Sequence, residues 1–475
     1  MKLYSSNEHY KLYHGNMLDM LEVIQPNTID SIITDPPYGL TSITKRFGNE
    51  KSAECKYGKD GSFQRLSKGF MGKEWDGSGI EYNIDAWRKC YEVLKPGGYL
   101  LAFGGSRTFH RIACAIEDAG FEIKDTIMWL YGQSMPKGMN IGLALDKRHG
   151  IDNRTGNVRT DGKGTDSGSN IYNSNNGSSN MTKEYEERVA QNKWKGWNTQ
   201  LKPSYEPIIV ARKPFKGTIL DNIEKYGVGG INIDECRVRN ETISIHNAPK
   251  GTFAGGEYGR GSDTSSYRDS TGRFPANTIL TYDETDFDEV CGGFPYTKNG
   301  GQNETSHREN WFRQETTPTR FAGDSGSASR YFYCAKASKK DRDEGLEDFE
   351  EIILDIGDER PSGGSWERRT GKKPLPRKNI HPTVKPTDLM QYLVRLVTPN
   401  NGTILDPFNG SGSTGKAVMY ENKERNKNYK YIGVELTEEY LPIAKARIEY
   451  VCNLTQEKLK EQQMTIFDYL ESKGK

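Results

Sequence analysis

Strand and helix signals alternate in two separate blocks of this 475-residue sequence, residues 28–132 and 388–451. Within each block, short apolar runs suited to buried strands are followed by segments whose apolar residues recur at helical spacing. Strands that alternate with helices form mostly parallel sheets covered by helices. The alternation therefore predicts an α/β fold, with the sheet divided between the two ends of the chain.

The stretch between the two blocks has a different composition. Residues 159–183 are rich in Gly, Ser and Asn, which favours a mobile loop within about 151–200. From about 240 to 375 the sequence shows no clear helix, and we interpret its acidic run 341–360 as solvated surface. The sequence thus predicts one divided domain, 1–239 with 376–475, and an inserted region, 240–375.

A rigid polar element ends the first apolar run. Asp35, Pro36, Pro37 and Tyr38 follow the run directly, in "TDPPYG". Proline has no backbone N–H and favours extended geometry in the residue before it, so the strand ends here. Open α/β sheets bind ligands at the carboxyl ends of their strands. A strand-ending turn with a capping Asp remains the alternative for such a motif in isolation.

A glycine-rich element ends an apolar run in the second block, in "LDPFNGSGSTG" (405–415). Glycines that open a helix after a strand allow close approach of a nucleotide-like ligand. The next apolar run ends in Glu435, at roughly the 20-residue distance expected for an acid that binds ribose hydroxyls. Ala417 follows Gly415-Lys416, which excludes a phosphate-binding P-loop. The pattern favours a cofactor that carries adenosine without phosphates.

Together with "HPTVKP" (381–386), these two motifs resemble those of the DNA amino-methyltransferases. Their order along the chain resembles that of the beta, or permuted, group of this family. Residues 70–76, 201–214 and 272–280 are similar to a branch found in phages and prophages. The resemblance implies a Rossmann-like sheet, a target-recognition region inserted at 240–375, S-adenosyl-L-methionine as the cofactor and double-stranded DNA as the partner. The implied reaction is site-specific methylation of the N6 amine of a flipped adenine.

The resemblance also implies roles for individual residues. Asp35 and the Pro36 carbonyl would accept the N–H groups of the target amine, within a catalytic shelf completed by Pro37 and Tyr38. Asn16 stands where the family often has Asp, with Asp19 as the substitute. The residues implied to hold the cofactor are Asn16, Lys385, Pro386, Thr387, Asp406, Phe408, Gly410, Gly412 and Glu435.

Two other functions stay open at this point. The first is methylation of cytosine N4, although cytosine enzymes of the family more often carry Ser at the position of Asp35. The second is a catalytically silent DNA-binding relative, which the retained Asp35 and glycines disfavour. Any restriction endonuclease partner would be a separate chain, and the motifs specify neither the oligomeric state nor the recognised DNA sequence.

The remaining features set broad limits. The formal net charge is +1, and the seven cysteines are scattered without a CxxC pair, which favours a reducing compartment and no metal site. The sequence has no long apolar run, so we expect a soluble, cytoplasmic protein. The divided domain makes one spatial demand: the run at 29–35 and the run at 402–406 must become neighbouring strands.

Overall fold

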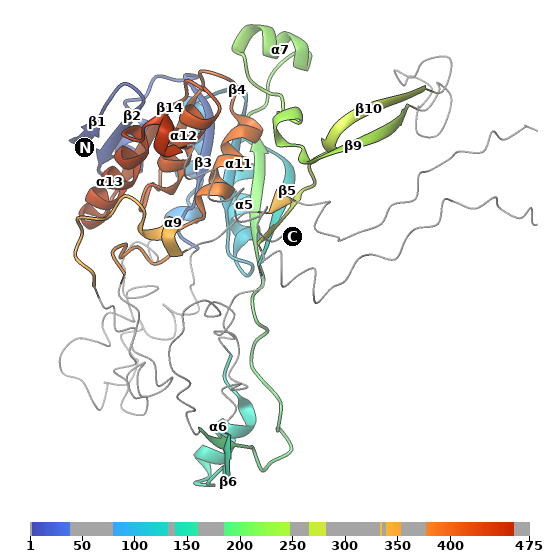
Figure 1. Cartoon of the computed structure of the whole chain (residues 1–475), viewed down its shortest axis with the longest axis vertical. Coiled ribbons are helices and arrows are strands. Elements are labelled where there is room, and N and C mark those ends of the chain that lie inside the picture. The colour runs from blue at the N-terminus through green and yellow to red at the C-terminus, as the bar shows by residue number, and fades with distance from the viewer. Residues whose placement is uncertain are drawn as a thin grey trace, which may run out of the picture. The chain divides into compact units, whose positions relative to one another are not determined.

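The computed structural model describes residues 2–38, 79–131, 138–159, 185–247, 266–281, 333–334, 339–352 and 377–459 (Figure 1). They belong to two compact units. The first unit combines Met1–Gly230 with Ala337–Lys475, and the second covers Ile231–Lys336. The second unit therefore overlaps the inserted region 240–375 expected from the sequence, but it ends at Lys336, and the chain rejoins the first unit there.

The first unit is built on a mixed sheet with the strand order β1-β2-β14-β13-β3-β4-β8-β5. Strands β2, β14, β13, β3 and β4 are parallel neighbours, while β8 runs antiparallel to both β4 and β5. Strand β1 pairs antiparallel with β2. The bounds are β1 Lys2–Ser6, β2 Tyr10–His14, β3 Ile29–Thr34, β4 Leu94–Phe103, β5 Glu122–Tyr131, β8 Tyr205–Arg212, β13 Thr403–Asp406 and β14 Lys430–Glu435.

The expected neighbours from the two ends of the chain are confirmed. Ser31 of β3 pairs with Ile404 of β13, and Ile32 pairs with Leu405, in parallel register. Every residue of β3 is buried, including the polar Asp30, Ser31 and Thr34. Buried polar groups need partners, and Ser31 finds one in the Thr398 hydroxyl at 2.8 Å. The Asp30 carboxylate accepts the Thr403 N–H at 2.8 Å, so polar contacts also fix the register of the two chain ends.

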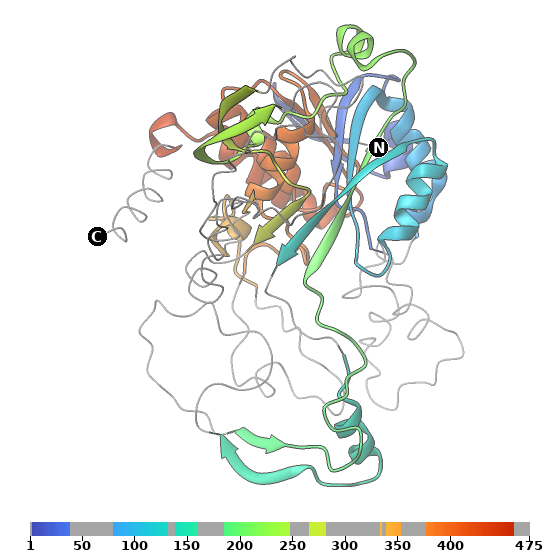
Figure 2. The ribbon, with the colours of Figure 1, turned by 90° about the vertical axis from the view of Figure 1, so that its right-hand side faces the viewer.

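Helices cover both faces of this sheet (Figure 2). One face carries α1 (Met17–Leu21), α4 (Ile84–Val93) and α5 (Phe109–Asp118), whose apolar side chains share a core with β3, β4 and β13. Trp87 of α4 is almost fully buried in this core, with Phe408 packed against it at 6.4 Å between ring centroids. The other helices of the second block are α11 (Thr387–Val397), α12 (Ser413–Glu424) and α13 (Leu441–Cys452). The layered α/β architecture expected from the sequence is therefore confirmed.

A separate element connects β5 to β8. It contains α6 (Ile141–Arg148) and the antiparallel pair β6 (Arg154–Arg159) and β7 (Tyr185–Arg188). This element overlaps the segment 151–200 that the composition assigns to a mobile loop. Residues 160–184, which carry most of the Gly, Ser and Asn, lie outside the described residues, as do residues 70–76.

Helical structure also occurs in segments for which the sequence pattern predicts no helix. Helix α9 (Lys339–Asp343) and the turn after it contain the start of the acidic run. After β8 the chain forms α7 (Ile219–Tyr226). In the second unit, β9 (Val238–Asn247) pairs with β10 (Ser266–Arg273), and β11 (Thr278–Thr281) pairs with β12 (Tyr333–Cys334). Within the described ranges, no helix has the length and apolar character needed to cross a membrane.

Candidate functional site

A cavity of about 400 Å³ opens at the carboxyl ends of β3, β13 and β14 in the first unit. This volume lies in the range of small-molecule sites, roughly 300–1,000 Å³. The cavity brings together most of the residues singled out in the sequence. Its lining includes Asn16, Asp35, Pro36, Pro37, Tyr38, Lys385, Asp406, Phe408, Gly410 and Glu435.

The polar group after β3 is held by its neighbours on the sheet. The Tyr38 carbonyl accepts a hydrogen bond from the Thr108 hydroxyl at 2.7 Å and from the Tyr82 hydroxyl at 3.3 Å. These contacts fix the chain just beyond the two prolines, whose own φ angles are already restricted. Asp35 thus lines the cavity from a segment of low conformational freedom.

One oxygen of Asp35 is engaged and the other is not. Its Oδ2 accepts a hydrogen bond from Lys385 Nζ at 2.7 Å, whereas its buried Oδ1 has no hydrogen-bond partner in the described part of the chain. Burial raises the pKa of Asp35, and the Lys385 ammonium opposes that shift. A buried acceptor without a partner is costly, so Oδ1 is suited to a donor supplied by a ligand.

Glu206, at the start of β8, completes the polar group around Lys385. Its Oε2 lies 3.3 Å from Lys385 Nζ and accepts the Tyr38 hydroxyl at 2.7 Å, and its Oε1 accepts the Tyr131 hydroxyl at 3.3 Å. Burial lowers the pKa of Lys385, but Asp35 and Glu206 outweigh this effect and hold the pKa above its usual value. Lys385 therefore stays charged between the two carboxylates.

Asp406, at the end of β13, is occupied by protein donors. Its Oδ1 accepts the Thr34 hydroxyl at 2.7 Å and the Phe408 N–H at 3.1 Å, and its Oδ2 accepts the Thr414 hydroxyl at 2.7 Å. Burial raises the pKa of Asp406 to about 6. The Asp406 carboxylate thus links Thr34 at the end of β3 to Thr414 at the start of α12, on one side of the cavity.

Glu435, at the end of β14, binds two backbone N–H groups. Its Oε2 accepts the Gly410 N–H at 2.6 Å, and its Oε1 accepts the Thr437 N–H at 2.7 Å. Burial raises the pKa of Glu435 to about 7. A carboxylate has about four acceptor positions, so Glu435 retains capacity for hydroxyl donors while it shapes the glycine turn.

The two glycines of that turn have different surroundings. Gly410 has φ +51°, and a Cβ there would lie 2.8 Å from His381 Nε2. Gly412 has φ +74°, and a Cβ there would meet Ala444 of α13 at 3.0 Å. Gly410 lines the cavity, whereas Gly412 is absent from the lining and packs against a helix. Both positions favour glycine, but only Gly410 does so next to the cavity.

Pro386 and Thr387 are likewise not among the residues that line the cavity. Thr387 begins α11, and Asp341 of α9 accepts both its N–H at 2.8 Å and its hydroxyl at 2.5 Å. The structure therefore separates Lys385, whose ammonium lies in the site, from the two residues after it. Those two residues start a helix.

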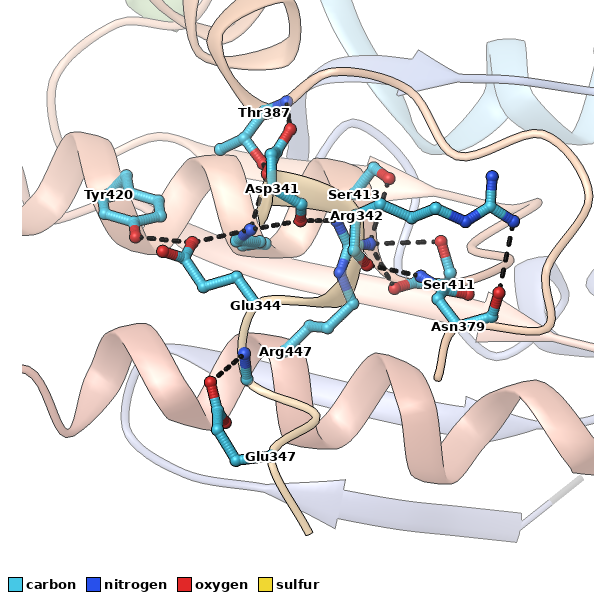
Figure 3. A network of polar contacts seen from close by, with 12 residues as sticks. Asp341, Arg342, Glu344, Glu347, Asn379, Thr387, Ser411, Ser413, Tyr420 and Arg447 are labelled. Atoms are coloured by element: carbon cyan, nitrogen blue, oxygen red, sulfur yellow. Dashed lines mark hydrogen bonds and ion pairs between the residues drawn. The ribbon is translucent and has the colours of Figure 1, made fainter. Parts of the chain in front are cut away.

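Helix α9 anchors the segment that carries Lys385 (Figure 3). The Arg342 guanidinium donates to the carbonyls of Asn379 at 3.2 Å and His381 at 2.5 Å. Asp341 and Glu344 pair with Lys416 of α12 at 2.7 and 2.8 Å. The interpretation of the run 341–360 as solvated surface is therefore wrong at its start, because these charges meet cations inside the first unit.

The fully buried Arg447 of α13 extends this network toward the glycine turn. Its guanidinium donates to the Ser411 carbonyl at 2.8 Å and to the Ser413 hydroxyl at 3.2 Å. Although burial raises the pKa of Asp341, Lys416 and Arg447 hold that pKa below its usual value. The network thus links α9, α12 and α13 behind the loops that form the cavity.

Sequence reasoning missed several residues of the site. Glu206 is the main one, and its signal is an acid at the head of the apolar run "EPIIVA". His381 and Asn409 also line the cavity. His381 packs on Tyr440 at 4.6 Å between ring centroids, and Asn409 accepts the Tyr431 hydroxyl at 2.8 Å. These contacts depend on packing between distant segments, so local pattern gives no indication of them.

The chain is similar in sequence to known proteins over much of its length. The family described as DNA methylase (N6_N4_Mtase) matches residues 29–446. The type II methyltransferase M.HindIII of Haemophilus influenzae is 25% identical over 240 residues, which cover 46% of this chain and 64% of that protein. The type II methyltransferase M2.MboI of Moraxella bovis is 36% identical over 101 residues, which cover 21% of this chain and 32% of that protein. The chain thus spans less than two thirds of each relative.

The chain is also similar to a solved structure. The M1.HpyAVI–SAM complex aligns with 92% of this chain and 99% of its own chain, at 14% identity and with a TM-score of 0.33.

Proposed function

Because the chain belongs to the DNA methylase family that matches its residues 29–446, we propose that it methylates the N6 amine of adenine at specific sites in double-stranded DNA. The methyl donor is S-adenosyl-L-methionine, the cofactor of these methyltransferases. We further propose that the chain belongs to the beta, permuted group, in its phage and prophage branch. The order of its motifs supports that assignment, since the catalytic motif precedes the cofactor motif.

The observation that carries the proposal is the unpartnered Oδ1 of Asp35 beside the cavity. An exocyclic amine on a purine is a weak nucleophile because its lone pair is delocalised into the ring. Oδ1 can accept one N–H of this amine and the Pro36 carbonyl can accept the other, which directs the lone pair away from the ring plane. Lys385 holds Oδ2 at 2.7 Å, so the carboxylate keeps its orientation during this step.

The other residues of the site align the reactants. The target base must leave the duplex to reach Asp35, and the rigid segment through Tyr38 offers it a binding shelf. The buried Lys385 and the partly buried Tyr38 and Glu206 form a fixed polar wall that needs no rearrangement when charge develops. Alignment of this kind supplies a large part of the rate in bimolecular transfers.

The second half of the cavity fits the cofactor. Its wall includes the apolar side chains of Met17, Ile80 and Val434, which suit a purine ring. Glu435 has a spare acceptor position for ribose hydroxyls, and the exposed amide of Asn16 offers a hydrogen bond to the adenine. When bound, the sulfonium supplies an activated methyl group. The chain's own residues hold the amine in line with it.

Asp35 also supports adenine over cytosine. A carboxylate accepts a hydrogen bond more strongly than a serine hydroxyl does, because charge-assisted hydrogen bonds are the stronger class. The resemblance associates Asp at this position with the adenine enzymes and Ser more often with the cytosine enzymes. A separate restriction endonuclease chain would be the partner of such an enzyme in a restriction–modification pair.

The test is to identify the methylated base. The protein is incubated with methyl-labelled S-adenosyl-L-methionine and amplified, unmethylated bacterial DNA, and the DNA is then digested to nucleosides and analysed by mass spectrometry. We expect labelled N6-methyl-2′-deoxyadenosine with the wild-type chain and none with Asp35→Ala. Label found only in N4-methyl-2′-deoxycytidine would assign the chain to cytosine. DNA binding without any label would make it a silent relative.

A further inference from the structure

The element between β5 and β8 begins and ends at the rim of the cavity. Tyr131, the last residue of β5, donates its N–H to the Ser204 carbonyl at 2.9 Å, just before β8 begins. Its hydroxyl contacts Glu206, which lines the cavity. The described residues 138–159 and 185–203 are therefore attached on both sides to the edge of the sheet that holds Asp35.

This element has an internal scaffold of its own. Asp146 of α6 is 1% exposed and accepts from the Gln191 N–H at 2.7 Å, the Asn153 amide at 2.6 Å and the Asn192 amide at 2.5 Å. The side-chain Oδ1 of Asn192 in turn accepts the Trp194 N–H at 2.9 Å. A buried carboxylate satisfied by three donors fixes the turn that follows β7.

That turn presents two tryptophans to solvent. Trp197 is 58% exposed and Trp194 is 36% exposed, and their rings meet edge to face at 5.1 Å between centroids. The Trp197 carbonyl accepts the Ile141 N–H at 3.0 Å, so the backbone under the exposed ring is fixed to α6. Exposed tryptophans on a rigid turn are unusual for a surface that contacts only water.

Cations surround the two rings. Lys193 and Lys195 flank Trp194 in the sequence, and Lys193 Nζ lies 6.0 Å from the centroid of that ring. Further exposed cations of the element are Lys147, Arg148, Arg188 and Lys202. Of its acids whose side chains the structure describes, Asp146 is buried under the turn and Asp152 is exposed, so exposed cations still predominate. The surface formed by Lys193, Trp194, Lys195 and Trp197 thus combines positive charge with exposed aromatic faces.

We propose that this Lys193–Trp197 surface binds the DNA substrate. Lysines contact phosphates and release counterions, and an exposed indole stacks on an unpaired base or sugar. Charge complementarity favours DNA over an apolar protein partner, and the element continues directly into β8, which carries Glu206 of the cavity lining. The inference rests on the proposed function only in taking DNA as the substrate.

The experiment measures DNA affinity of the full chain, with cofactor bound, by fluorescence anisotropy at several salt concentrations. For Trp197→Ala we expect Kd to rise about 5- to 150-fold, the range for loss of one stacked base, with the salt slope unchanged. Trp197→Phe keeps an aromatic face and should restore most of the affinity. For Lys193→Ala with Lys195→Ala, we expect the slope of log Kd against log salt to fall by about 2.

Matched controls separate this inference from the proposed function. Lys430→Ala removes an exposed lysine from β14, outside the element, and should leave both the affinity and the slope unchanged. Calorimetric cofactor affinity should be the same in all variants. Unchanged DNA affinity in Trp197→Ala and in the double lysine variant, with an active wild-type chain, overturns the inference alone. Unchanged DNA affinity together with lost self-association would assign the surface to a second copy of the chain. Unchanged DNA affinity together with lost binding to anionic lipid vesicles would assign it to a membrane, and either outcome overturns the inference. A wild-type chain that neither binds nor methylates DNA overturns both proposals.

Discussion

Lys385 and Asp35 lie 350 positions apart in the chain, yet Lys385 Nζ is 2.7 Å from Asp35 Oδ2. This ion pair joins the two halves of the divided domain where the charged side chains of the cavity come together. Because Glu206 also lies 3.3 Å from the same ammonium, Lys385 stays paired even if one carboxylate is removed. Asp35, which we propose to bind the base, can therefore be changed without leaving a lone buried cation.

Asp35→Ala should abolish methyl transfer while cofactor binding persists. The carboxylate contacts the target amine in our proposal, and loss of one aligned hydrogen-bonding group typically costs at least ~100-fold in rate. Glu206 continues to neutralise Lys385, so the cavity should keep its shape. Single-turnover methylation measures the first effect and isothermal titration with S-adenosyl-L-methionine the second. A parallel loss of cofactor affinity would contradict this division of roles.

Gly410→Ala should weaken cofactor binding by about tenfold or more. A Cβ at φ +51° costs roughly 1–2 kcal/mol and would press on His381, which lines the cavity. Gly412→Ala is the matched control, because it introduces similar backbone strain but meets Ala444 outside the lining. Thermal melting should show both variants destabilised, whereas calorimetry should show reduced cofactor affinity only in Gly410→Ala. Equal cofactor affinity in the two variants would remove Gly410 from the binding site.

Cofactor affinity should rise with pH through about 7. Burial holds the pKa of Glu435 at about 7, above its usual value. The ribose hydroxyls that we propose Glu435 binds form stronger hydrogen bonds with the charged carboxylate than with the protonated acid. The contribution of Glu435 to folding stability has the opposite sign: it is full below pH ~4.5 and is lost as pH rises through about 7. Calorimetric Kd between pH 5.5 and 8.5 tests this.

Glu435→Gln is the control for that titration. It should bind the cofactor more weakly at pH 8 and lose the pH dependence centred near 7. Asp406, with a pKa of about 6, is intact in this variant, so a smaller dependence centred near pH 6 should remain. A full pH profile retained in Glu435→Gln would show that another group controls binding.

Lys416→Met should destabilise the fold by about 3–5 kcal/mol, the typical effect of breaking a buried ion pair. Lys416 is fully buried, and its loss leaves Asp341 and Glu344 without their main cation. Arg88→Met breaks the exposed pair with Asp85, at 52% and 71% side-chain exposure, and should cost only ~0–1 kcal/mol. Urea unfolding measures both. Similar small losses in the two variants would mean that the α9 network is not important for stability.

The sequence predicts candidate residues best where a charged side chain stands at the end of a strand. Asp35 follows β3 and Glu435 ends β14, and both positions are recognisable because an apolar run stops at a charged residue. The adjacency of β3 and β13 followed from the order of the motifs. The mostly exposed β1 and the half-buried β2 were not predicted, although the alternation in "YKLYH" is a strand pattern.

Residues that act through distant packing could not be predicted in the same way. Glu206 reaches the cavity because β8 inserts antiparallel between β4 and β5, which no local pattern specifies. Asp341 and Glu344 resemble surface charges in the sequence. The cations that they meet, Lys416 and Arg447, lie on helices about 70 to 110 positions later in the chain. Charge alone does not distinguish a solvated run from a buried network.

The pairing of β3 with β13 has a consequence for how the protein is made. Thr34 and its partner Asp406 are 372 residues apart, so a ribosome working at about 5–20 residues per second adds the second roughly 20–70 s after the first. During that interval, the backbone groups of β3 that later pair with β13 have no partner strand. Nascent chains of this protein should therefore depend on chaperones, and slower translation of the last hundred codons should increase their aggregation.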